Sequence, residues 1–197
     1  SNQVIYSYNF FYNQNGNKNK LVKVESNTTG EEYNIEYSAN GEPSLYLGWT
    51  ISYDMKNITT VLNSNYEINY TYNASGIRTS KVLTKNNSTT TTEYILDGTN
   101  IIKEIRSGEN NATLQYFYDS NNEIVGFCSY SFKKAEENSD CELRGIYVKT
   151  NMKRCGIGRK LINYVKREFR KANKQKMILW CLKENYPSRK FYEAMGG

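Results

Sequence analysis

The sequence predicts an α+β protein in two parts: antiparallel β-hairpins up to about Phe127, then a mixed sheet with two helices. Three observations predict this class. Residues up to Ser120 are rich in Asn, Ser, Thr and Tyr and show no helical periodicity. Short alternating runs there are separated by turn-forming clusters. Beyond them a strand, a glycine loop and a long amphipathic pattern follow in order. We therefore expect a β domain over 1–122 and an α/β domain over 123–197.

The first part repeats a short unit in which a tyrosine precedes a cluster of turn-forming residues. Because Asn, Asp and Gly tolerate positive φ and Tyr, Thr, Ile and Val favour strands, each unit predicts a hairpin. An alternative interpretation of the repeated aromatics is a carbohydrate-contacting surface. The units begin at Tyr12, Tyr37, Tyr53, Tyr72 and Tyr118, with room for another around Tyr94.

The second part contains a strand followed by a glycine loop at a helix start. Glu142–Val148 alternates apolar residues, as a strand with one buried face does. From Ile157 the apolar residues recur at helical spacing, which predicts a helix to about Asn173. Gly156 and Gly158 then lie at a helix N-terminus, where unpaired N–H groups and the macrodipole favour an anion. The alternative is a tight turn before an amphipathic helix.

Four cations surround this loop, and two further elements follow it. The cations favour phosphate contact, although a solvated basic face would look the same. Met177–Leu182 is an apolar run that predicts a strand buried on both faces, parallel to the first. Pro187 fits the first turn of a short helix to about Met195. The cations are Lys153, Arg154, Arg159 and Lys160.

These motifs resemble the GNAT (Gcn5-related) N-acetyltransferases. The loop signature of that family is Gln/Arg-x-x-Gly-x-Gly/Ala, and Lys153–Gly158 differs from it in having lysine first. Leu143–Val148 is similar to the central strand of the family, Asn185–Gly196 to its next motif, and Glu123–Tyr130 to the strand pair before the central strand. The resemblance covers about 123–197. It implies acetyl-CoA as co-substrate and an amine, unidentified by the sequence, as acceptor.

The resemblance also implies roles for individual residues. The backbone at Ile146 and Val148 would contact the pantetheine arm, Asn185 would orient the cofactor, and Tyr192 would protonate the departing thiolate. Glu142 is a candidate base; its alternative is a solvent-facing carboxylate, and that of Tyr192 is an aromatic that packs the short helix. The expected cofactor-binding set is Ile146, Tyr147, Val148, Lys153, Arg154, Cys155, Gly156, Ile157, Gly158, Arg159 and Asn185.

The first part resembles the YD repeats of RHS proteins, over about 6–127. The likeness is best at Tyr72–Lys81 and Leu45–Asp54. In that family the hairpins form a shell around a C-terminal cargo, often a toxin. An alternative function is therefore a fragment of an RHS/YD-repeat surface or toxin-delivery protein with no catalytic activity. Nothing before about residue 123 resembles the opening strand and two helices usual in an acetyltransferase, and the chain stops at Gly197, before the family's last two strands. We therefore expect a partial domain, active or inactive.

Composition agrees with two modules of opposite charge. Residues 1–120 carry a net charge of −3 and residues 121–197 one of +9, for a total of +6. An anionic cofactor explains the basic part with fewer assumptions than nucleic acid does. The four cysteines lack Cys-x-x-Cys spacing and the chain has no histidine, so we expect no metal. Without a recognisable signal peptide or spanning run, the prediction is a cytoplasmic location, or a secreted or cell-surface one if the RHS-like part dominates. The oligomeric state is open.

Overall fold

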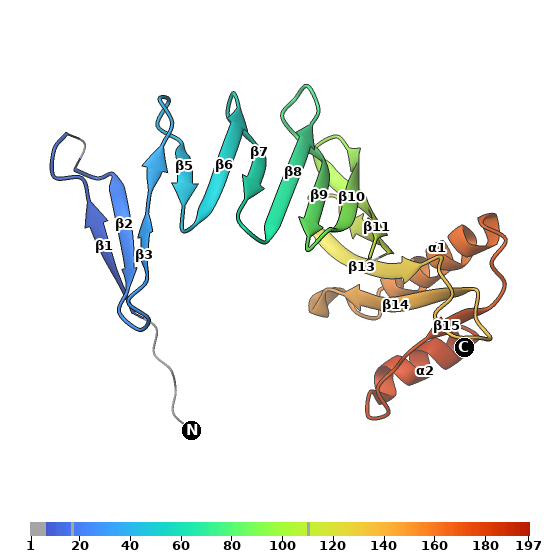
Figure 1. The fold of residues 1–197 in the computed structure, drawn as a ribbon. Helices are drawn as coiled ribbons and strands as arrows, with labels where there is room; N and C mark the ends of the chain where they lie inside the picture. The colour runs from blue at the N-terminus through green and yellow to red at the C-terminus, as the bar shows by residue number, and fades with distance from the viewer. Residues whose placement is uncertain (1–6, 17, 110) are drawn as a thin grey trace. The chain divides into compact units, whose positions relative to one another are not determined.

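The computed structural model describes residues 7–16, 18–109 and 111–197. The chain divides into two compact units, one up to Thr89 and one from Thr90. We describe each unit by itself (Figure 1).

The first unit consists of antiparallel strands, and its described residues contain no helix. Three strands form a small sheet in the order β1-β2-β3. From β4 to β9 each strand pairs antiparallel with the next one along the chain. The alternating runs in the sequence therefore do form hairpins. The strands are β1 (Tyr8–Tyr12), β2 (Leu21–Ser26), β3 (Glu32–Asn34), β4 (Glu36–Tyr37), β5 (Pro43–Tyr46), β6 (Trp49–Asp54), β7 (Asn57–Leu62), β8 (Tyr66–Tyr72) and β9 (Arg78–Lys85).

The tyrosine that opens each repeated unit has a recurrent structural role. Its hydroxyl donates a hydrogen bond to a backbone carbonyl 10 to 17 residues upstream in four of the units. In these four units the tyrosine therefore links its hairpin to a strand that precedes it in the sequence, through a hydrogen bond from its hydroxyl to the main chain. The bonds are Tyr37 to Leu21 (2.8 Å), Tyr53 to Pro43 (3.0 Å), Tyr72 to Ile58 (2.7 Å) and Tyr118 to Ile101 (2.8 Å).

The turns that follow Tyr72 and Tyr118 are built in the same way. Asn73 Oδ1 accepts from the backbone N–H groups two and four residues ahead, at 3.0 and 2.9 Å. Asp119 Oδ1 does the same at 2.9 Å in both cases. The last residue of each turn has positive φ, +75° at Gly76 and +60° at Asn122. The side-chain acceptor and the left-handed residue explain why Asn, Asp and Gly recur at these positions.

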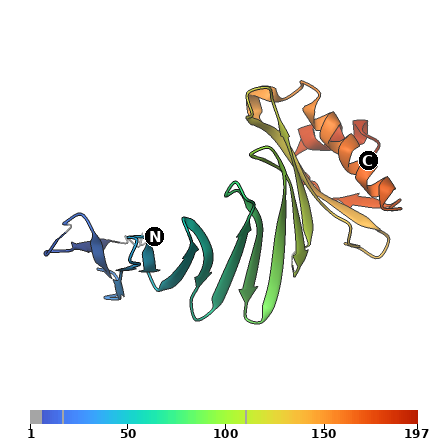
Figure 2. The same cartoon turned by 90° about the horizontal axis from the view of Figure 1, so that it is seen from above.

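The second unit is a mixed sheet with α1 on one face (Figures 1 and 2). From β10 to β14 neighbouring strands are antiparallel, whereas β14 and β15 are parallel and joined through α1. Both predicted helices are present, and the parallel pair is confirmed. The elements are β10 (Ser88–Asp97), β11 (Asn100–Gly108), β12 (Ala112–Tyr118), β13 (Ile124–Ser131), β14 (Cys141–Val148), a 3₁₀ turn (Thr150–Met152), α1 (Ile157–Lys171), β15 (Met177–Leu179) and α2 (Tyr186–Ala194).

The main core of this unit lies between α1 and the sheet. The apolar stripe of α1, from Ile157 to Phe169, packs on Cys128 and Tyr130 of β13 and on Leu143 of β14. Gly126 makes this approach possible. A Cβ there would lie 3.2 Å from side-chain atoms of both Ile157 and Leu161, and 2.8 Å from a backbone oxygen. The glycine therefore fixes how closely the start of α1 lies on β13.

One prediction about the second part is wrong. The run Met177–Leu182 was expected to be a strand buried on both faces. Instead β15 ends at Leu179 and is the edge strand of the sheet. Trp180 and Leu182 are 67% and 76% exposed. An apolar run shows that burial is favourable, but whether a neighbour covers it depends on the tertiary arrangement.

Candidate functional site

The glycine loop leads into a helix start that no side chain caps. Gly156 is the N-cap of α1 in the left-handed region, with φ of +82°. The first turn contains no acidic residue, and no side chain accepts a hydrogen bond from it. The first helical amide to bond within the helix is that of Lys160, to the carbonyl of Gly156 at 3.0 Å. The amides before it thus point out of the helix end, where partial positive charge gathers.

The four predicted cations lie around this helix start and are all exposed. Among the residues that the structure describes, none of them forms an ion pair. Arg154 has positive φ of +63°, unusual for a residue with a Cβ. The cationic groups and the free amides thus converge without an internal counter-charge, which is an arrangement that suits a polyanion.

A cavity of about 950 Å³ lies between this loop, the end of β14 and α2. Most of the residues predicted to contact the cofactor line it, and so does Tyr192. From α2 it is also lined by residues that the sequence reasoning missed, among them Pro187, Ser188 and Phe191. Their place within the family-like motif Asn185–Gly196 is the one signal that could have pointed to them. The predicted residues that line it are Ile146, Tyr147, Val148, Lys153, Arg154, Gly156, Gly158, Arg159 and Tyr192.

The end of β14 has a free edge toward this cavity. Parallel pairing between β14 and β15 covers only Cys141–Leu143 and ends at Leu179. β14 continues to Val148, paired with β13 on its other side. In the described part of the chain, the stretch from Arg144 to Val148 therefore has one strand partner. Its outward backbone N–H and C=O groups are available to an extended ligand.

Gly158 brings the two helices together beside the cavity. A Cβ at this position would lie 3.3 Å from two ring atoms of Phe191. Phe191 in turn stacks edge-on with Tyr192, with ring centroids 5.3 Å apart. The second glycine of the loop thus serves the packing of α2 rather than a left-handed backbone, because only Gly156 has positive φ.

Three of the predicted cofactor-binding residues do not line the cavity. Ile157 is 8% exposed and belongs to the core. Cys155 is exposed, and its thiol is 3.6 Å from the carbonyl of Lys153. Asn185 caps α2, and its Oδ1 accepts from the backbone N–H of Ser188 at 3.3 Å. The observed role of Asn185 is therefore that of a helix cap.

Tyr192 lies at the boundary of two cavities. It lines the one described above and a second of about 780 Å³ that runs along β15. Burial is the main cause that raises the pKa of its phenol, and the nearby Cys181 and Tyr147 raise it further. A raised pKa keeps the hydroxyl protonated at neutral pH, as a proton donor requires.

Glu142 is placed less favourably for chemistry. It lies near the start of β14, lines neither cavity and forms an ion pair with Arg144, whose Nε lies 3.0 Å from its carboxylate. Its side chain is 18% exposed. Because Glu142 lines neither cavity, it would act on an acceptor at the first cavity only through water.

The described residues contain no group of three or more His, Cys, Asp or Glu that could hold a metal ion. All four cysteines are free thiols. No described helix has the length and apolar character needed to cross a membrane.

Comparison with known proteins identifies the second part of the chain. The model of the "Acetyltransferase (GNAT) family" matches residues 83–197. The chain belongs to the GNAT acetyltransferase family. The match begins within β9, upstream of residue 123, where the domain boundary was expected. It gives no support to the RHS/YD resemblance of the first unit, which stays a prediction.

Solved structures and curated proteins add little. A tetramutant of the BH1408 protein from Bacillus halodurans is 15% identical, with a TM-score of 0.40 over 45% of this chain and 61% of that chain. The chain thus spans less than two thirds of that protein. A protein of unknown function (BF3112) from Bacteroides fragilis is 16% identical, with a TM-score of 0.21 over 74% of this chain and 94% of that one. No curated protein matches.

Proposed function

We propose that the chain is an acetyl-CoA-dependent N-acetyltransferase that holds its co-substrate in the cavity between β14, the glycine loop and α2. One observation carries the proposal. The cavity joins a strand edge with free backbone groups to an uncapped, cation-surrounded helix start. Acetyl-CoA needs these two features together, because its pantetheine arm is amide-rich and its diphosphate is a polyanion.

The diphosphate is proposed to bind at the start of α1. The amides of Ile157 and Gly158 and the left-handed turn at Gly156 would present N–H groups to phosphate oxygens. Lys153, Arg154 and Arg159 line the same cavity and add positive charge. Lysine in the first position of the loop signature supplies a point charge where the family has Gln or Arg.

The pantetheine arm is proposed to run along the free edge of β14. There its amides would pair with the backbone at Ile146 and Val148, as an added strand does. The thioester would then lie toward Tyr192 of α2, which lines the same cavity. Backbone N–H groups near Val148 would polarise the thioester carbonyl.

The proposed reaction is direct transfer of the acetyl group to a primary amine. The neutral amine nitrogen attacks the carbonyl carbon, a C–N bond forms and the C–S bond breaks. The amine loses one proton to a base, either Glu142 through water or solvent. Tyr192 gives its phenolic proton to the departing thiolate and regains one from solvent.

Two measurements test this proposal in sequence. Calorimetric titration of acetyl-CoA into the full chain should give saturable binding that weakens with added salt, because phosphate contacts are screened. A thiol-release assay with a panel of primary amines should then show turnover. Absence of acetyl-CoA binding would exclude the proposal. Binding without turnover on any amine would leave an acetyl-CoA-binding domain that lacks transferase activity.

A second candidate role is a non-catalytic fragment of an RHS/YD-type surface or delivery protein. The observation in its favour is the tyrosine-to-carbonyl hydrogen bond that recurs from hairpin to hairpin. Under this alternative the chain would transfer no acetyl group to any amine. The thiol-release assay therefore separates the two candidates.

A further inference from the structure

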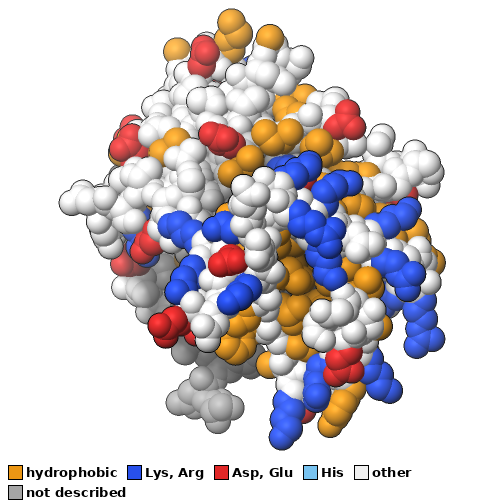
Figure 3. All heavy atoms as spheres, turned by 90° about the vertical axis from the view of Figure 1, so that its right-hand side faces the viewer, with side chains coloured by type: hydrophobic (Ala, Val, Ile, Leu, Met, Phe, Trp, Pro, Cys, Tyr) orange, Lys and Arg blue, Asp and Glu red, His pale blue; other side chains and the backbone are white. Residues whose placement is uncertain are grey.

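The outer face of α1 carries positive charge that the proposed acetyl-CoA site does not use. Six residues of this helix are exposed, and five of them are Lys or Arg. None of the six is acidic and none is apolar. Lys and Arg side chains gather over the helices of the second unit (Figure 3). The exposed residues of α1 are Arg159, Lys160, Asn163, Arg167, Arg170 and Lys171.

Four of these residues form a line along the helix. They follow one another at intervals of three or four residues, so they share one side of α1. The buried residues Val165 and Phe169 lie on the opposite side and pack on the sheet. The line is about 16 Å long, from the rise per residue of a helix. We call it the outer stripe, and its residues are Lys160, Asn163, Arg167 and Lys171.

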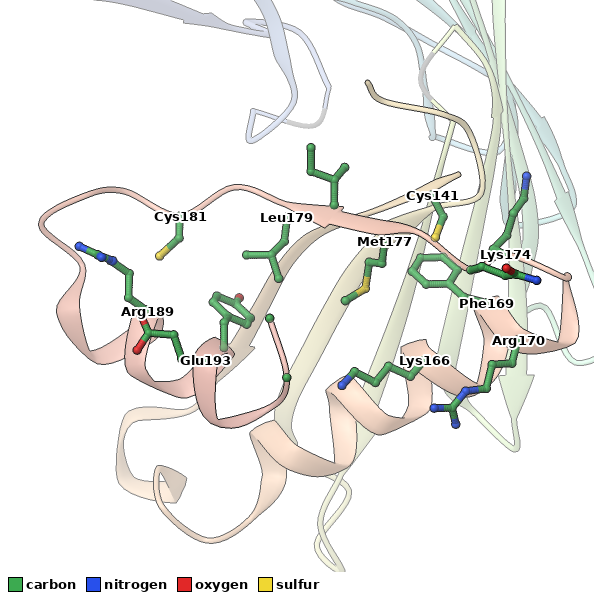
Figure 4. A pocket seen from close by; sticks show the side chains of 15 residues that line it. Cys141, Lys166, Phe169, Arg170, Lys174, Met177, Leu179, Cys181, Arg189 and Glu193 are labelled. Atoms are coloured by element: carbon green, nitrogen blue, oxygen red, sulfur yellow. The ribbon is translucent and has the colours of Figure 1, made fainter. Parts of the chain in front are cut away.

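The outer stripe lies outside both cavities. None of its residues lines the cavity at the glycine loop or the one along β15. On the same helix, Lys166 and Arg170 line the cavity along β15 instead (Figure 4). The proposed diphosphate site accounts for Lys153, Arg154 and Arg159, which line its cavity. An anionic cofactor at that site therefore leaves the charge of the stripe unexplained.

The stripe has little internal counter-charge. Glu168 is the single acidic residue of α1, and its side chain is 16% exposed. Its carboxylate lies 3.0 Å from Lys171 and 3.5 Å from Lys103 of β11. Within the described part of the chain, Lys160 and Arg167 form no ion pair. The stripe thus presents cations to solvent that a polyanion would neutralise.

The composition of the outer face indicates the class of polyanion. The centre of a protein interface is apolar or aromatic, and a helix that lies on a membrane buries an apolar face. α1 exposes no apolar side chain, which argues against both. Single-stranded nucleic acids stack their bases on aromatic side chains, and α1 exposes none. The phosphates of a double helix require only cations and polar donors, which the stripe supplies.

We propose that the outer stripe of α1 binds the phosphate backbone of a double-stranded nucleic acid, without contacts to base edges. Lys160, Arg167 and Lys171 would neutralise phosphates, and the amide of Asn163 would donate to a phosphate oxygen. A duplex carries one charge per about 1.7 Å of its axis, so a stripe of about 16 Å meets several phosphates. The affinity would be independent of base sequence. The proposal does not depend on acetyl-CoA binding.

Fluorescence anisotropy of the full chain with labelled duplexes of about 20 base pairs, two helical turns, tests the proposal. We expect saturable binding with a Kd of about 1–100 µM at physiological salt, equal for two unrelated base sequences. DNA and RNA duplexes should both bind, because both present phosphates. Three neutralised phosphates predict that the logarithm of the binding constant falls against the logarithm of the salt concentration with a slope of about −2.7 for DNA.

Two triple variants locate the binding surface. Lys160→Gln, Arg167→Gln and Lys171→Gln together should weaken the DNA duplex about tenfold or more and bring the salt slope near zero, because each phosphate contact contributes about one unit. The matched control removes the same charge from three exposed residues of the first unit and should leave the affinity and the slope unchanged. Far-UV circular dichroism checks that both variants are folded. The control substitutions are Lys18→Gln, Lys56→Gln and Lys85→Gln.

Each of the contrary results would overturn the proposal. These are no binding of either duplex at low salt, or an equal loss of affinity in the control variant. Complete displacement of the duplex by acetyl-CoA would place it at the glycine loop instead. Polyglutamate that competes as well as unlabelled duplex at equal charge would identify an acidic protein as the partner. Binding to phosphatidylserine vesicles at a salt concentration that releases the duplex would identify a membrane.

Discussion

At the scale of single residues, the hydroxyl group of a tyrosine has two different uses in this chain. In the repeated hairpins it is structural, because Tyr37, Tyr53, Tyr72 and Tyr118 each donate to a distant carbonyl. In the second unit Tyr192 lies between two cavities with a raised pKa. Removing one oxygen atom tests each use with little change in shape.

Tyr192→Phe is expected to lower kcat by about 10²–10⁴-fold, the usual contribution of a general acid. Affinity for acetyl-CoA should change little, because the hydroxyl is needed for the leaving thiolate rather than for binding. Thiol release and calorimetry measure the two effects. Because burial raises the pKa of this phenol, the wild-type rate should not fall on the alkaline side until the pH exceeds the ordinary value near 10. Wild-type turnover of the variant would assign Tyr192 to packing alone.

Tyr72→Phe is expected to lower the free energy of unfolding by about 1 kcal/mol, since it leaves the carbonyl of Ile58 without its donor. Denaturant titration of the full chain measures this change. Tyr46→Phe is the control: Tyr46 is 40% exposed, and its hydroxyl has no hydrogen bond in the described structure. Equal effects of the two substitutions would show that the hydrogen bond to Ile58 does not stabilise the hairpins.

At the scale of elements, the two glycines of the loop have different structural roles, which the Gly-x-Gly pattern alone does not distinguish. Gly156 supplies a left-handed backbone, whereas Gly158 supplies space for Phe191. Substituting Gly156 with Asp would therefore strain the backbone as well as add charge, and the result would not report on phosphate binding alone. Arg154 is a better probe, since it is a charged residue already held at positive φ.

Arg154→Gly should weaken acetyl-CoA binding by roughly tenfold through loss of a charged contact to phosphate. It should not lower the melting temperature, because glycine adopts φ of +63° without strain. Calorimetry and thermal denaturation measure the two effects. The control is Arg167→Gln, which removes the same charge at a residue of α1 that does not line the cavity. Glycine is not used at Arg167, because glycine inside a helix lowers its stability. Unchanged affinity in Arg154→Gly, with the fold intact, would remove this side chain from the site.

Gly158→Ala is expected to cost about 1–3 kcal/mol of stability, the usual range for overpacking, because the added methyl group meets the ring of Phe191. The double variant with Phe191→Leu should recover part of the loss, since the smaller side chain vacates that space. Chemical denaturation of the three variants checks this. No recovery in the double variant would mean that the cost does not come from contact between α1 and α2.

At the scale of the whole molecule, the chain combines a hairpin unit with an acetyltransferase unit, and a ligand of the second should protect that unit alone. Acetyl-CoA at 100 times its Kd would stabilise the unit that binds it by about 2.7 kcal/mol. Hydrogen exchange should therefore slow across the described residues from Thr90 and stay unchanged across those before it. Protection that also extends through β4 to β9 would show that the two units unfold together.

The sequence by itself determined the elements whose cause is local. The helical spacing of the apolar residues predicts α1, and the Tyr-Asn and Tyr-Asp turns predict the hairpins. The order of strand, glycine loop and helix predicts the parallel strand pair. Most of the candidate site could also be predicted from the sequence. Its residues from Ile146 to Arg159 belong to one strand and the loop after it, so they cannot lie far apart.

Only the tertiary structure decided features that depend on distant neighbours. Residues remote in sequence determine whether Met177–Leu182 is covered and which glycine packs against Phe191. Two further roles are set by residues close in sequence: Asn185 caps α2 through the backbone N–H of Ser188, and the carboxylate of Glu142 pairs with Arg144 on the same strand. A local sequence pattern indicates which roles a residue is able to take. Which of these roles it takes depends on the residues that contact it in the folded unit.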